Sequence, residues 1–208
     1  MRVPSKLALR TLNLFLGLIL YGVSLGMMVE SNLGLAPWSV LDQGLSRTTG
    51  LSMGTIVILG GAVVLLLWIP LRQRPGFGTV ANIVVVGLAV DAALAVLPAT
   101  TWMPARVAYL LGGVLVNGLA TGLYIGARMG PGPRDGLMTG LHARFPNVSI
   151  RLIRTGIEVV VLAAGFLLGG TVGVGTVLYA LSIGPLAQLF LRVFTIRSAG
   201  GPAPAPAS

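Results

Sequence analysis

The feature of this sequence that most constrains its fold is an internal duplication. Residues 34–41 read GLAPWSVL and residues 130–137 read GPGPRDGL, so each segment has a glycine, a proline three residues later and a leucine four residues after that. At the same spacing of 96 the match continues with four further pairs: Gly22 and Gly118, Gly26 and Gly122, Gly44 and Gly140, and Leu45 and Leu141. At a spacing of 97, residues Gly76–Thr79 match Gly173–Thr176, and Gly87 matches Gly184. Two copies of one unit therefore fill the chain, and such a repeat determines the architecture before any single motif does.

The composition indicates an integral membrane protein. Of the 208 residues, 55% are hydrophobic and only 9% are charged, whereas a soluble domain carries about 25% charged residues. Lipid can solvate the apolar side chains that such a chain cannot bury. The chain has no cysteine, and His142 is the only histidine, so we expect no disulfide, no metal site and no cofactor.

Six apolar segments are long enough to cross a bilayer as helices, and the expected fold class is therefore an all-α polytopic membrane protein. The segments are residues 11–29, 53–71, 77–97, 105–127, 150–169 and 174–195. We divide the chain into an N-terminal segment of residues 1–10, a first three-helix repeat of residues 11–97, a second of residues 105–195, and a disordered tail of residues 199–208.

The distribution of Lys and Arg predicts the orientation. With the N-terminus in the cytoplasm, twelve of the 14 basic residues lie on the cytoplasmic side and only Arg47 and Arg106 lie outside. This bias accounts for the net charge of +9 without nucleic acid as a partner. We expect both termini to be cytoplasmic, in a bacterial inner membrane, and we expect Trp38 and Trp68 to lie at the two membrane boundaries.

Three spans in each copy make the second copy enter the membrane from the opposite face. The predicted architecture is thus a pair of inverted repeats, as in many secondary transporters. Pro37 and Pro133 should each open a short helix, over residues 37–47 and 133–145, since proline suits the first helical position. Two interpretations remain open: the short helices lie flat at the interface as connectors, or they dip into the membrane as re-entrant half-helices.

Two segments carry a resemblance to a known family. The pattern LGLAPW at residues 33–38, followed by TGLSMGT at residues 49–55, resembles the YczE/YyaS/YitT group of bacterial membrane proteins. The second copy, GARMGPGPRDGLMTGL at residues 126–141 and GGTVGVGTVL at residues 169–178, is most similar to actinobacterial YczE-type members. The resemblance implies a polytopic inner-membrane protein and brings no substrate or catalytic residue. Family members often have Asp at the position of Ser39, which matches Asp135 in the second copy.

Charged residues within the expected spans are the candidate functional residues, because a charge at the centre of a membrane helix costs roughly 2.5–3.5 kcal/mol. Glu158 follows Arg154 by four residues, which allows either an ion pair within the helix or a proton- or cation-coupling carboxylate in a cavity. Asp135 in a first helical turn suits a capping role, and Arg134 suits an anion or a lipid phosphate. The candidate substrate-binding residues are Arg134, Asp135, Glu158, Ser39, Pro37 and Pro133.

These features predict a small-solute transporter or permease-like protein with its site between the inverted repeats. The alternative is a non-transporting accessory factor that supports the maturation of another enzyme or secreted product. No catalytic motif is present, so we do not expect an enzyme. The expected partners are membrane lipid and a small-molecule or ion substrate, and a homodimer is compatible with so small a bundle.

Overall fold

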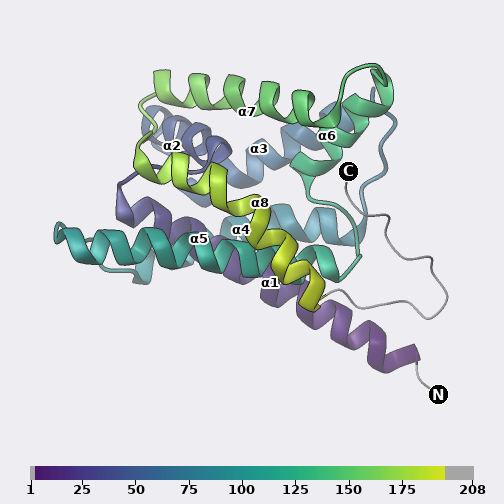
Figure 1. Cartoon of the computed structure of the whole chain (residues 1–208), viewed down its shortest axis with the longest axis horizontal. Helices are drawn as coiled ribbons and strands as arrows, with labels where there is room; N and C mark the ends of the chain where they lie inside the picture. Colours follow the sequence, from purple (N-terminus) through teal and green to yellow (C-terminus); the bar gives the residue numbers. More distant parts are fainter. Residues whose placement is uncertain (1–2, 195–208) are drawn as a thin grey trace.

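The computed structural model describes residues 3–194, and this part of the chain is built from α-helices alone (Figure 1). The helices are α1 (Val3–Ser31), α2 (Pro37–Thr49), α3 (Met53–Trp68), α4 (Phe77–Val96), α5 (Met103–Gly126), α6 (Pro133–Arg144), α7 (Ile150–Leu167) and α8 (Val174–Phe194). The expected tail of residues 199–208 lies outside the described residues.

Local signals in the sequence explain where the helices begin. Ser52 and Ser149 precede α3 and α7, and their hydroxyls accept hydrogen bonds from the backbone N–H of Thr55 and Leu152, at 3.1 and 3.3 Å. The short helices α2 and α6 begin at the two prolines, as expected. Gly50 ends α2 with a positive φ of 74°.

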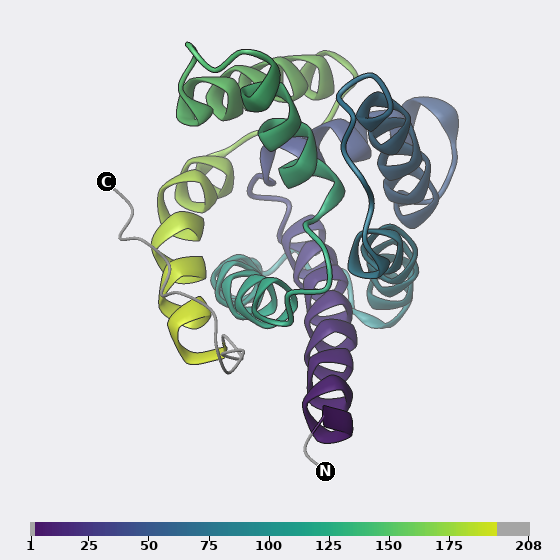
Figure 2. The ribbon, with the colours of Figure 1, turned by 90° about the vertical axis from the view of Figure 1, so that its right-hand side faces the viewer.

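Helix α1 lies between α4 and α5 and packs against both (Figure 2). Glycines permit the close approach: a Cβ at Gly17 would lie 2.8 Å from the backbone nitrogen of Tyr124, and a Cβ at Gly26 2.7 Å from Cβ of Ala93. Outside this layer, α8 packs on α5 and α3 packs on α4, while α2 packs on α7 and α6 on α3. The first and second halves of the chain are therefore interleaved.

Four of the described helices, α1, α4, α5 and α8, are long and apolar enough to cross a membrane, which makes the chain a polytopic all-α membrane protein. The chain bends by 116° between α2 and α3, and the two helices together could form one more crossing of the membrane. Helix α3 alone has 16 residues, and α7 carries Arg151, Arg154 and Glu158 within 18 residues. Helices α3 and α7 are therefore not clear spans on their own, and the described residues contain fewer clear spans than the six expected.

The two halves make the same contact with each other twice. The N–H of Gly78, at the start of α4, donates to the carbonyl of Met129 at 2.8 Å, and the N–H of Gly175, at the start of α8, donates to the carbonyl of Leu33 at 2.8 Å. In each case the last helix of one half is bound to the Gly-Pro loop of the other half. Two equivalent backbone hydrogen bonds therefore join the two halves.

Threonines cap the starts of α4 and α8. Thr79 Oγ1 accepts from the N–H of Gly76 at 3.2 Å, and Thr176 Oγ1 accepts from the N–H of Gly173 at 3.3 Å. Thr79 also donates to the carbonyl of Pro131 at 2.7 Å, which adds a second bond across the halves.

Asp91 of α4 holds the start of α3. Its carboxylate accepts from the N–H of Gly54 and from the hydroxyl of Ser52, both at 2.6 Å. A carboxylate at a helix N-terminus satisfies free N–H groups and interacts favourably with the helix dipole.

We therefore expect Asp91→Ala to lower the free energy of unfolding by about 1–2 kcal/mol, and Asp91→Asn by about half as much because the amide oxygen still accepts hydrogen bonds. Thermal unfolding in detergent measures both. Equal losses in the two variants would show that the hydrogen bonds contribute nothing beyond the charge.

Trp68 and Trp38 are held by contacts within the protein. Trp68 is 1% exposed, and its Nε1 donates to the carbonyl of Pro133 at 3.0 Å; its place at a membrane boundary stays a prediction. The guanidinium of Arg134 lies over Trp38, with its Cζ 4.8 Å from the centroid of the Trp38 ring. Both rings serve contacts between the halves, which the interface preference of tryptophan does not reveal.

Candidate functional site

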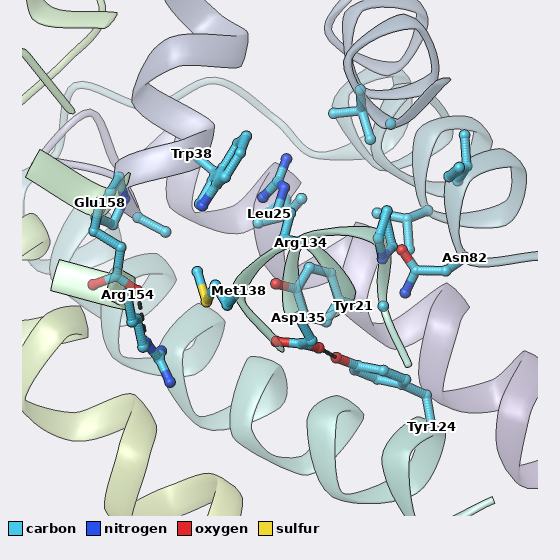
Figure 3. A pocket seen from close by; sticks show the side chains of 18 of the residues that line it. Tyr21, Leu25, Trp38, Asn82, Tyr124, Arg134, Asp135, Met138, Arg154 and Glu158 are labelled. Carbon is cyan, nitrogen blue, oxygen red and sulfur yellow. Dashed lines mark hydrogen bonds and ion pairs between the residues drawn. The ribbon is translucent and has the colours of Figure 1, made fainter. Parts of the chain in front are cut away.

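A cavity of about 110 Å³ lies where the N-termini of α2 and α6 meet, and it has charged side chains in its wall (Figure 3). Its polar and helix-start residues are Tyr21, Pro37, Trp38, Asn82, Tyr124, Pro133, Arg134, Asp135, Arg154, Glu158 and Tyr179. They come from both halves of the chain. The volume suits a small ion or polar solute and is below the several hundred Å³ of a site for a drug-sized ligand.

The starts of both short helices are buried. Ala36 and Pro37 at the start of α2, and Gly132 and Pro133 at the start of α6, are all buried and all line the cavity. The first turn of a helix has free N–H groups and the positive end of the helix dipole. Two such ends therefore meet at one cavity inside the protein.

Arg134 is the central cation of this cavity. Its Nη2 lies 2.7 Å from Oδ2 of Asp42, whose side chain is 4% exposed, and its guanidinium stacks over Trp38. Asp42 and Trp38 belong to α2, whereas Arg134 belongs to α6. One side chain thus binds the short helix of the other half by charge and by stacking.

Asp135 and Glu158 are the two acids in the cavity wall, and each has a partner. Asp135 Oδ2 accepts from the hydroxyl of Tyr124 at 3.1 Å. Glu158 Oε1 accepts from Nε of Arg154 at 2.8 Å, which is the ion pair expected within α7. Figure 3 shows these two pairs on opposite sides of the cavity, with Trp38 and Arg134 between them.

Five of the six candidate residues line this cavity: Pro37, Pro133, Arg134, Asp135 and Glu158. Ser39 does not. Its side chain is 1% exposed, and its Oγ is buried with no hydrogen-bond partner among the described residues. The acid of α2 is Asp42, one helical turn further along, which binds Arg134 and is not part of the cavity wall.

Sequence reasoning missed Asp42 and the tyrosines. Asp42 is one of only five acids in the chain, and it lies in a helix too short to span a membrane, which is the signal that could have found it. Tyr179 is held by a buried network in which its hydroxyl donates to Asn117 Oδ1 at 3.0 Å and Asn117 Nδ2 donates to Ser24 Oγ at 2.7 Å. Of these three residues, Tyr179 lines the cavity.

The chemistry of the site is that of polar binding. Within residues 3–194, His, Cys, Asp and Glu form no group of three that could hold a metal ion. The wall presents two guanidinium groups, two carboxylates, three tyrosine hydroxyls, one amide and one indole. Such a wall can bind a small polar or charged solute through both signs of charge.

Comparisons with known proteins give a family and no activity. A family described as being of unknown function, DUF6198, matches residues 8–192. An uncharacterized protein of Haemophilus influenzae is 42% identical over 180 residues, which cover 86% of this chain and 82% of that protein. The uncharacterized membrane protein YczE of Bacillus subtilis is 32% identical over 192 residues, covering 91% and 88% of the two chains.

The uncharacterized protein YyaS of Bacillus subtilis is 24% identical over 182 residues, covering 86% of this chain and 90% of that protein. No solved structure matches the chain significantly.

Proposed function

This chain belongs to the DUF6198 family of unknown function, with YczE-type membrane proteins among its relatives, and we propose that it is a permease for a small polar solute. In this proposal the chain resides in a bacterial inner membrane with both termini in the cytoplasm, and the solute passes through the cavity between the two halves. The role requires no catalysis.

The observation that carries the proposal is that two buried helix N-termini, one from each half, open into a single cavity with charged walls. Discontinuous helices whose N-termini meet near the bilayer midplane form the substrate sites of many secondary transporters. Irregular backbone such as the Gly-Pro loops is tolerated at membrane depth only where protein or water surrounds it. This favours the re-entrant interpretation of α2 and α6 over the interfacial connector.

A six-span inverted topology is part of the proposal. At about 1.5 Å per residue, α7 is about 27 Å long and α3 about 24 Å, close to the hydrocarbon thickness. The paired contacts Gly78 to Met129 and Gly175 to Leu33 support two equivalent halves. A two-fold axis in the membrane plane would relate them.

The two basic residues on the proposed outer side have structural partners there. Arg106 donates to the carbonyls of Ser31 and Asn32, both at 2.7 Å, and Arg47 donates to the carbonyl of Gly169. Each cation therefore satisfies carbonyls at a helix C-terminus, which is where a cation is favoured. The two basic residues on the outer side are therefore compatible with the proposed positive-inside orientation.

Water access to the cavity tests the proposal. Since the chain has no native cysteine, Asn82→Cys, in the cavity wall, and Val84→Cys, on the apolar outer face of the same helix, form a matched pair. We expect a membrane-impermeant methanethiosulfonate reagent to modify Asn82→Cys at least ten times faster than Val84→Cys in intact cells or inside-out vesicles. Mass spectrometry of the purified protein measures the modified fraction.

If Asn82→Cys resists the reagent from both sides, the cavity is sealed and the permease proposal fails. That result would favour the accessory-factor alternative, which needs no aqueous path. Equal and fast modification of both positions would show that this part of α4 is not in the membrane, and it would also overturn the proposal.

A further inference from the structure

Hydrogen-bond donors without an acceptor gather in the wall of the cavity. The indole Nε1 of Trp38 is buried and has no hydrogen-bond partner among residues 3–194. The N-cap residues of α2 and α6, Ala36 and Gly132, have no side chain that can accept a hydrogen bond. In the first turns of these helices, the backbone N–H groups of Trp38, Arg134 and Asp135 have no acceptor within the same described part of the chain. Free donors at a helix N-terminus suit a carboxylate or another anionic group.

Arg134 adds further donors at the same place. A guanidinium group carries five N–H donors. Asp42 is the only acceptor bonded to that of Arg134 within the described residues, through Nη2 at 2.7 Å. The guanidinium is also stacked on Trp38, which keeps its remaining N–H groups close to the indole ring. An anionic group can therefore meet donors from both short helices.

The same wall holds two carboxylates that each have an oxygen to spare. Tyr124 donates to Oδ2 of Asp135, and Arg154 donates to Oε1 of Glu158. The other oxygen of each carboxylate bonds to no side chain among residues 3–194. An ammonium group has three donors and no acceptor, so it suits such oxygens. The two carboxylates would repel an anion that carried no positive group of its own.

The charges around the cavity nearly cancel. Arg134 and Arg154 carry two positive charges, and the ionised forms of Asp42, Asp135 and Glu158 carry three negative charges. The N-termini of α2 and α6 contribute about half a positive charge each. A solute with a net charge would leave water for a site that has no net counter-charge to offer, which is costly. A solute that carries both charges and is neutral overall avoids this cost.

We infer that the solute is a small zwitterion, an amino acid of about the size of alanine. Its carboxylate binds at the starts of α2 and α6, to the indole N–H of Trp38 and the guanidinium of Arg134, and its ammonium group binds to Asp135. At about 15 Å³ for each water-sized group, the cavity of about 110 Å³ holds roughly seven such groups, which suits a small amino acid. The inference rests on the proposed function, because it names the class of solute that the permease takes, but binding can be measured without transport.

Three small molecules of matched shape test the inference. L-Alanine carries both charges, propionate lacks the ammonium group, and ethylamine lacks the carboxylate. We expect the purified protein in detergent to bind L-alanine at least ten times more tightly than either analogue, because each analogue leaves one charged group of the site without a partner. Isothermal titration calorimetry measures the three dissociation constants, and the rise in melting temperature with each compound checks them.

Two variants assign the two ends of the solute. Asp135→Asn should weaken the binding of L-alanine at least tenfold without weakening that of propionate, which has no group for this carboxylate. Trp38→Phe keeps an aromatic ring but removes the indole N–H, so it should weaken the binding of both compounds. Asp91→Asn is the matched control, since Asp91 is an acid outside the cavity wall, and it should leave both dissociation constants unchanged.

The inference fails if L-alanine binds no more tightly than propionate or ethylamine, or does not bind at all. It also fails if Asp91→Asn weakens the binding of L-alanine as much as Asp135→Asn does. Selective binding of L-alanine together with an unreactive Asn82→Cys would leave the zwitterion site intact and reject the permease. A reactive Asn82→Cys without a preference for L-alanine would reject the zwitterion and leave the permease.

Discussion

Gly136→Ala is expected to lower the free energy of unfolding by about 3 kcal/mol and to reduce the amount of protein that accumulates in the membrane. A Cβ at Gly136 would overlap the six-membered ring of Trp68. That ring cannot move away, because it is 1% exposed and its Nε1 is bonded to the carbonyl of Pro133 at 3.0 Å. The fluorescence-detected melting temperature in detergent and the yield in membranes measure the loss.

Gly156→Ala is the matched control, since Gly156 also lies inside a helix but a Cβ there would meet nothing within 4 Å. Alanine is favoured over glycine in a helix by about 1 kcal/mol, so this variant should be as stable as the natural protein or slightly more so. Equal stability of the two alanine variants would contradict the close packing of α6 on Trp68.

Asp42→Ala is expected to cost about 3 kcal/mol of stability, because it leaves the guanidinium of Arg134 in the protein interior without its counter-ion. The two side chains are 4% and 25% exposed, and the ion pair joins α2 to α6. The double variant Asp42→Ala/Arg134→Ala should be more stable than Asp42→Ala alone, since both charges are gone. Chemical unfolding of the four proteins gives the coupling energy as a double-mutant cycle.

Glu158→Gln provides the comparison for an exposed pair. The side chains of Arg154 and Glu158 are 55% and 30% exposed and lie one turn apart on one helix. Such pairs contribute about 0.5 kcal/mol, so the loss should be several times smaller than for Asp42→Ala. Similar losses at both sites would mean that the pair between α2 and α6 is no more important than a surface contact.

The positions of the helices followed from local signals. Pro37 and Pro133 open the short helices, and apolar segments of sufficient length mark the others, so the expected boundaries agree with the structure to within a few residues at most ends. Helix α1 is the exception, because it begins at Val3, well before the expected residue 11. Most glycines of the duplication lie at tight contacts between helices, with Gly184 as an exception.

Contacts between distant parts of the chain did not follow from such signals. The pairing of Asp42 with Arg134 joins residues 92 positions apart, and no periodicity within α2 or α6 predicts it. The preference of tryptophan for interfaces predicts a membrane boundary for Trp68, but it does not predict that the ring packs against Gly136. Ser39 was chosen as the counterpart of Asp135, but it lies outside the cavity wall, and the acid of α2 that binds Arg134 is Asp42.

The reciprocal bonds between the halves have a consequence for the synthesis of the protein in the cell. The carbonyl of Leu33 emerges early from the ribosome, but the N–H of Gly175 that it accepts comes more than 140 residues later. Likewise, the N–H of Gly78 at the start of α4 cannot form its bond until Met129 has been synthesised. Neither half can reach its final arrangement alone. In a truncated product that lacks α8, the carbonyl of Leu33 in the loop before α2 has lost the N–H of Gly175. The chain therefore cannot complete its fold until its final helix has been synthesised.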